Sequence, residues 1–133
     1  MLKLLFAAFL LAHGLIHASW FSPAPQRTAG GPEWPFEMAK SWAVSGLGLD
    51  PGVMRATGTA LIAATTALLV AAALAAAGWI VPAAWWPTLV VGGAVASAVT
   101  LALFFHPWIL LGLAIDAALL WTVLVTGWQP VSP

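Results

Sequence analysis

The chain has 133 residues, of which 62% are hydrophobic and only 6% are charged, with four basic and four acidic side chains that sum to zero. A soluble domain carries about 25% charged residues, so this composition excludes a soluble globular fold. It also excludes a disordered chain, which has few apolar residues. The mean hydropathy of +1.01 indicates an integral membrane protein. The absence of Cys excludes thiol chemistry, and the lack of a basic run argues against nucleic-acid binding.

Four apolar segments approach or exceed the roughly 20 residues that a helix needs to cross a bilayer. They cover residues 2–20, 54–81, 85–105 and 108–128. The connections between the second and third segments and between the third and fourth are very short, which forces the helices that they join to be antiparallel. We therefore predict an all-α fold, a single four-span transmembrane domain over residues 1–133 with an up-down bundle layout. We expect the first span to be retained, because no small-x-small cleavage site follows it.

Tryptophan marks the ends of these spans. Six of the nine Trp residues fall at predicted helix ends, where an indole finds both apolar and polar surroundings at the membrane interface. These six are Trp20, Trp79, Trp85, Trp86, Trp108 and Trp128. The pattern predicts an interfacial belt.

The long loop, residues 21–50, contains one further predicted element. Residues 33–42 predict a short amphipathic helix on the membrane surface, with Pro35 at a favourable early position. Glu37 and Lys40 are spaced i, i+3 and can form an ion pair. Asp50 followed by Pro51 is typical of a helix N-terminus, so these two residues are predicted to begin the second span.

Small residues repeat every four positions on two of the spans. Gly92 and Gly93 precede Ala96 and Ser97 in the third span. The second span has a similar stripe, Ala60, Ala64, Ala67 and Ala71. Such spacing favours close helix approach in lipid, so both faces are predicted to pack.

The polar residues gather in one half of the predicted bundle. Asp116 lies nine residues after Pro107, about 13 Å below the loop-side surface, and His13 lies seven residues before Trp20, about 10 Å deep. His13 is therefore the best partner for Asp116. The other half is apolar, whereas a through-pore needs polar residues along its whole length. We expect a pocket open to one side, with candidate residues His13, His17, His106 and Asp116 and rim candidates Arg55, Glu33 and Glu37.

Asp116 has two interpretations. An ionisable residue inside the membrane is a functional hypothesis by default. The structural alternative is an interhelical hydrogen bond to a Thr or His that fixes the bundle.

The histidines have four interpretations. His13 and His17, at i and i+4, share a helix face and can be hydrogen-bonded interface residues without a cofactor, which is our expectation. Haem held between His106 and either of them is one alternative. A divalent metal held by His13, His17 and Asp116 is another. A small ligand such as a quinone is the third.

The start of the chain resembles the first helix of DoxX-like small membrane proteins. The resemblance rests on one run of residues, Leu10-Leu11-Ala12-His13-Gly14-Leu15-Ile16-His17, and on the four-span layout. It implies a four-helix bundle and, for some members, association with quinone-linked oxidation as a membrane subunit. Only His13 and Gly14 match the motif positions.

These observations together predict a non-catalytic accessory or ligand-binding protein with a one-sided polar pocket. The alternatives are a redox subunit that binds haem, metal or quinone, and a proton-coupled small-molecule transporter. The expected partners are the lipid bilayer and either other membrane subunits or further copies of this chain. We expect a multi-pass protein of a bacterial-type cytoplasmic membrane.

Overall fold

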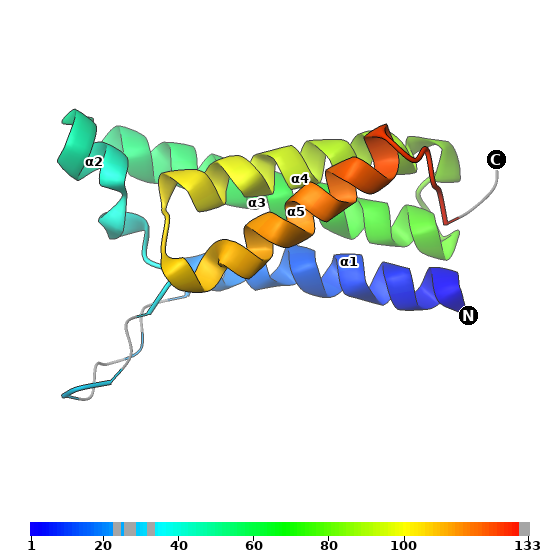
Figure 1. Cartoon of the computed structure of the whole chain (residues 1–133), viewed down its shortest axis with the longest axis horizontal. Helices are drawn as coiled ribbons and strands as arrows, with labels where there is room; N and C mark the ends of the chain where they lie inside the picture. The colour runs from blue at the N-terminus through cyan, green and yellow to red at the C-terminus, as the bar shows by residue number, and fades with distance from the viewer. Residues whose placement is uncertain (23–24, 26–28, 32–33, 131–133) are drawn as a thin grey trace.

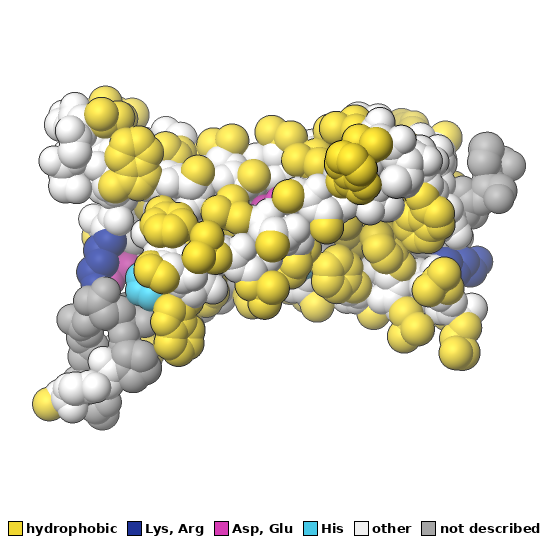
Figure 2. Space-filling model, in the orientation of Figure 1, with side chains coloured by type: hydrophobic (Ala, Val, Ile, Leu, Met, Phe, Trp, Pro, Cys, Tyr) yellow, Lys and Arg dark blue, Asp and Glu magenta, His cyan; other side chains and the backbone are white. Residues whose placement is uncertain are grey.

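The structure, a computed structural model, describes residues 1–22, 25, 29–31 and 34–130, and every regular element in these ranges is helical. Four segments are long and apolar enough to cross a membrane: Leu2–Phe21, Pro51–Ala77, Ala83–Leu103 and Pro107–Leu124. The predicted all-α, multi-pass fold is confirmed. Figure 2 shows one face of the molecule as a hydrophobic surface whose Lys and Arg side chains gather at the two ends.

The four spans lie side by side as an elongated bundle, with the start of the first span and the end of the last at the same end (Figure 1). The first two are α1 (Leu2–Ala18), extended by the 3-10 turn η1 (Ser19–Phe21), and α3 (Pro51–Ala77). The others are α4 (Trp86–Leu103), which follows η3 (Ala83–Trp85), and α5 (Leu110–Leu124), which follows η4 (Pro107–Ile109).

Local sequence signals explain both ends of α3. The Asp50 side chain accepts a hydrogen bond from Val53 N at 2.9 Å, and Pro51 occupies the first turn, as predicted. The helix ends four residues before the predicted boundary at residue 81. Gly78 adopts a φ of 76°, a left-handed conformation that terminates helices and suits glycine.

The helix in the first loop forms later in the chain than predicted. Within the described part of residues 33–42, only the 3-10 turn η2 (Met38–Lys40) forms, and α2 (Trp42–Leu47) follows it. Long-range contacts fix this position, because Ser41 Oγ donates to Leu103 O at 2.8 Å and Trp42 Nε1 donates to Ala102 O at 2.6 Å. The predicted ion pair between Lys40 and Glu37 is confirmed at 3.0 Å.

The spans pack in the order α1, α3, α4, α5. Gly14 of α1 lies so close to α3 that an added Cβ would stand 3.0 Å from Leu69 Cβ. Gly93 of α4 contacts the other side of Leu69, which confirms the predicted close face on this span. The predicted alanine stripe on α3 is wrong: its members are exposed or half-buried, and Ile62, Thr65, Leu69 and Ala72 are buried instead.

Only some of the tryptophans predicted to form an interfacial belt are exposed at helix ends. Trp79, Trp85 and Trp108 are largely exposed at helix ends. Trp20 and Trp86 instead belong to two separate hydrophobic cores, one at each end of the bundle. Trp86 packs against Phe6 and Trp128 at the end opposite the long loop. The apolar half predicted from the sequence is therefore closed by aromatic packing.

Candidate functional site

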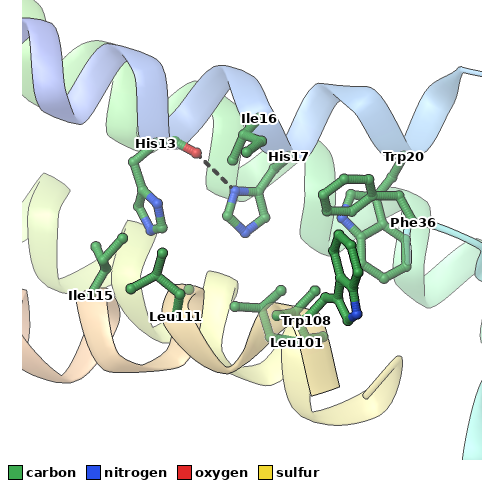
Figure 3. A pocket seen from close by; sticks show the side chains of 11 residues that line it. His13, Ile16, His17, Trp20, Phe36, Leu101, Trp108, Leu111 and Ile115 are labelled. Carbon is green, nitrogen blue, oxygen red and sulfur yellow. Dashed lines mark hydrogen bonds between the residues drawn. The ribbon is translucent and has the colours of Figure 1, made fainter. Parts of the chain in front are cut away.

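Four buried side chains from three spans form one hydrogen-bonded network. His13 Nε2 lies 2.9 Å from Asp116 Oδ1, which joins α1 to α5. Ser97 Oγ of α4 donates to Asp116 Oδ2 at 2.6 Å and lies 2.9 Å from His17 Nε2. His17 Nδ1 donates to His13 O at 3.0 Å, which completes the network (Figure 3). We call these residues, His13, His17, Ser97 and Asp116, the polar network.

The surroundings of the polar network explain why its members bond to one another. Ser97 and Asp116 are fully buried, and His17 is 2% exposed. An isolated carboxylate near the bilayer centre costs ~2.5–3.5 kcal/mol even on the mildest scale, so Asp116 needs hydrogen-bond donors or a proton. His13 and Ser97 occupy both of its oxygens. The sequence prediction that His13 partners Asp116 is confirmed.

A pocket of about 140 Å³ adjoins the polar network between α1 and α5. Its polar wall is formed by His13 and His17, while Leu111 and Ile115 line it from α5 (Figure 3). The remaining lining is mainly apolar and aromatic: Ile16, Trp20, Phe36, Leu101, Trp108, Ile109 and Gly112. The pocket thus differs from the polar cavity expected from sequence, because most polar atoms are used inside the network.

The size of the pocket suits one ring. An engineered cavity of about 150 Å³ holds a benzene molecule. Three side chains around the pocket are more than half exposed on the outer surface, namely Ile16, Trp108 and Leu111. On this side the pocket lies against the apolar outer surface of the bundle.

Two polar atoms of pocket-lining residues have no hydrogen-bond partner among the described residues. Trp20 is 3% exposed, and its Nε1 is a buried donor without an acceptor among the described residues. His13 uses Nε2 on Asp116, and its Nδ1 bonds no residue in the described ranges. The Trp20 indole N–H has no accessible surface, so His13 Nδ1 is the polar atom of the two that a partner in the pocket can reach.

The metal site suggested by His13, His17 and Asp116 is not formed. In the part of the chain that the structure describes, no group of three or more His, Asp or Glu side chains is arranged to hold a metal ion. The physical reason is hydrogen bonding: His17 Nδ1 bonds a backbone carbonyl, and its Nε2 faces Ser97 rather than Asp116.

The remaining candidates lie elsewhere. His106 Nδ1 accepts from Trp108 N at 3.2 Å and caps η4, and its side chain lines a separate pocket with Glu37 and Lys40. The structure therefore does not bring His106 to the pocket of His13 and His17, as the haem alternative requires. Arg55 is exposed on α3 and lines neither pocket. Glu33 lies outside the described residues.

Ser97 is the network residue that sequence reasoning missed. It was interpreted only as a small residue that allows close helix packing. A hydroxyl in the middle of an apolar span also needs a hydrogen-bond partner. This requirement is the sequence signal that could have placed Ser97 in the polar network. Trp20 was likewise assigned to the interface, and nothing in its sequence position indicates burial.

Comparisons with protein-family models, curated proteins and solved structures found no match to this chain. The resemblance to DoxX-like proteins stays a prediction.

Proposed function

We propose that this protein is a non-catalytic membrane protein that binds a small, mainly apolar molecule bearing one ring and an oxygen atom. The observation that carries the proposal is the ring-sized pocket between α1 and α5, with the unbonded His13 Nδ1 in its wall. Ligand pockets are typically apolar with a few convergent polar groups, and this pocket has that composition.

The proposed binding mode assigns a role to each wall. The ring packs against Leu111, Ile115 and the aromatic side chains, and its hydroxyl donates a hydrogen bond to His13 Nδ1 while His13 Nε2 pairs with Asp116. The ligand enters from the lipid between α1 and α5. By analogy with the resemblance noted above, we place the protein in a bacterial-type cytoplasmic membrane, either as an accessory subunit or as a homo-oligomer.

The test compares two molecules of similar shape, p-cresol and p-xylene, only the first of which has an oxygen. Equilibrium binding to proteoliposomes is measured and corrected for partition into protein-free liposomes. We expect saturable binding of p-cresol and weaker binding of p-xylene. One neutral hydrogen bond is worth about 0.5–1.5 kcal/mol, so p-cresol should bind about 2- to 12-fold more tightly than p-xylene.

One variant tests the location. Leu111→Trp places a larger ring at the pocket and should lower affinity at least about tenfold. The matched control is Leu110→Trp, an exposed neighbour that does not line the pocket. If the two variants bind p-cresol equally well, or if wild-type binding never saturates, the proposal fails.

A redox role with a quinone is the second candidate. The pocket volume favours a quinone over haem, because about 140 Å³ holds a single ring but not a porphyrin. A short-chain benzoquinone that competes with p-cresol, and whose reduction potential changes on binding, would support this role.

A further inference from the structure

The polar network determines which ring nitrogen of His13 carries a proton. His13 Nε2 lies 2.9 Å from Asp116 Oδ1, so one proton stands between these two atoms. If Oδ1 is the acceptor of this hydrogen bond, the proton belongs to His13 Nε2. The tautomer of His13 therefore follows from how the carboxyl group of Asp116 is used.

Asp116 Oδ1 accepts both in the carboxylate and in the carboxylic acid. A carboxylate has no proton to give, so His13 Nε2 has to donate. In the acid, a proton on Oδ2 donates to Ser97 and leaves the Ser97 hydroxyl proton for His17 Nε2. A proton on Oδ1 instead would leave the buried contact between Ser97 and His17 without one. Both forms of Asp116 thus hold the His13 proton at Nε2.

His13 consequently presents a hydrogen-bond acceptor to the pocket. A neutral imidazole carries one proton, so Nδ1 has a bare lone pair when Nε2 is protonated. His17, the other histidine of the wall, uses Nδ1 on a backbone carbonyl and turns Nε2 to Ser97. The indole N–H of Trp20 is buried, and the indole nitrogen of Trp108 points away from both histidines (Figure 3). An occupant therefore meets an acceptor at the polar wall.

We propose that Asp116, by holding the His13 proton at Nε2, makes the pocket selective for ring molecules that carry a hydroxyl donor. Asp116 does not line the pocket, so it acts as a positioning residue. An oxygen that only accepts, as in an ether or a carbonyl, would face the Nδ1 lone pair, and both atoms would stay unbonded. A buried polar group left unpaired in this way makes a site reject the analogue without the donor. Of a quinone couple, only the hydroquinone has the required donor.

The selectivity is tested with two isomers, p-cresol and anisole, because the ether oxygen of anisole accepts hydrogen bonds but donates none. The inference rests on the proposed function for its ligand, and binding to wild-type proteoliposomes is again corrected for partition into lipid. We expect p-cresol to bind at least about fivefold more tightly than anisole. Equal affinities overturn the inference and leave the proposed function standing. Absence of saturable binding of either isomer refutes the proposed function instead.

Two variants of Asp116 test its role in the selectivity. Asp116→Asn keeps an oxygen acceptor for His13 Nε2, and its amide N–H donates to Ser97, so the preference for p-cresol should stay within about twofold of wild type. Asp116→Leu has a similar size but no acceptor, so the His13 proton is free to move to Nδ1. Its preference for p-cresol over anisole should fall at least about threefold. An unchanged preference in Asp116→Leu overturns the role of Asp116.

Nitrogen NMR of the ligand-free protein tests the His13 tautomer without any binding measurement. Wild type and Asp116→Asn should carry the His13 proton on Nε2 and leave Nδ1 bare. Asp116→Leu should populate the tautomer protonated at Nδ1, whereas a merely structural role of Asp116 would leave the tautomer unchanged. A proton on His13 Nδ1 in wild type, in a neutral or a cationic ring, overturns the inference whatever the binding results are.

Discussion

Ser97 supplies one hydroxyl to two contacts, and this makes it the link between Asp116 and His17. It donates to Asp116 and faces His17, so α4 holds together groups from α5 and α1. Among the described residues, Asp116 Oδ2 and His17 Nε2 form no hydrogen bond other than the one with Ser97. Loss of the hydroxyl would therefore leave two buried polar atoms unsatisfied.

We expect Ser97→Ala to destabilise the protein by about 1–3 kcal/mol, the cost of leaving buried polar groups without partners. Unfolding of the purified protein by denaturant titration in mild detergent is the measurement. Thr122→Val is the matched control, because the Thr122 hydroxyl bonds only the carbonyl of Ala118 in its own helix. That variant should change stability by less than about 0.5 kcal/mol. Equal effects of the two substitutions would show that the network adds no stability.

Residue depth could be predicted from the sequence, whereas residue orientation around the helix axis could not. Counting residues along two helices placed His13 beside Asp116, because the helix rise is constant. The alanine stripe on α3 failed for the opposite reason. A span that is apolar on all sides has no amphipathic face to indicate which side is buried. The same limit hid the burial of Trp20 and the pairing of Ser97 with His17.

At the scale of elements, α1 and α3 make the closest backbone approach to the site. Gly14 stands directly after His13 and packs on Leu69, and Thr66 Oγ1 donates to Gly14 O at 3.2 Å. An added Cβ at Gly14 meets Leu69 Cβ, which is fixed to its backbone and cannot rotate away. The position of His13 therefore depends on this contact between two helices. The location of α2 similarly depends on bonds to α4, which explains why local sequence signals misplaced it.

We expect Gly14→Ala to separate α1 from α3 and to cost about 1–3 kcal/mol of stability, as overpacking usually does. It should also weaken p-cresol binding, because His13 and His17 move with α1. Thermal unfolding and ligand binding are measured on the same preparation. Gly46→Ala provides the comparison, since its added Cβ would have ordinary contact at 3.9 Å. If Gly14→Ala is as stable as wild type, the helices have more freedom to adjust than the packing indicates.

For the whole molecule, the bundle layout predicts which sites share a side of the membrane. Four spans place the start of α1 and the end of α5 on one side and α2 on the other. The chain has no Cys, so single Cys substitutions can be labelled without background. Lys3, Ser45 and Gln129 are exposed and lie in these three regions.

We expect Lys3→Cys and Gln129→Cys to react with a membrane-impermeant maleimide from the same side of sealed vesicles. Ser45→Cys should react only from the opposite side. Permeabilised vesicles show that each Cys is reactive, which controls for buried labels. Reaction of the two terminal positions from opposite sides would require an odd number of spans and would contradict the fold.

The aromatic packing of Trp86, Phe6 and Trp128 closes the bundle at the end away from the long loop. A molecule that enters between α1 and α5 must consequently return to the leaflet from which it came. The occupancy of the pocket is then set by the concentration of this molecule in that leaflet rather than in water. Apparent affinities measured against aqueous concentration should scale with lipid partition and with the amount of lipid present. Two bilayers of different composition can therefore give the same protein different apparent dissociation constants.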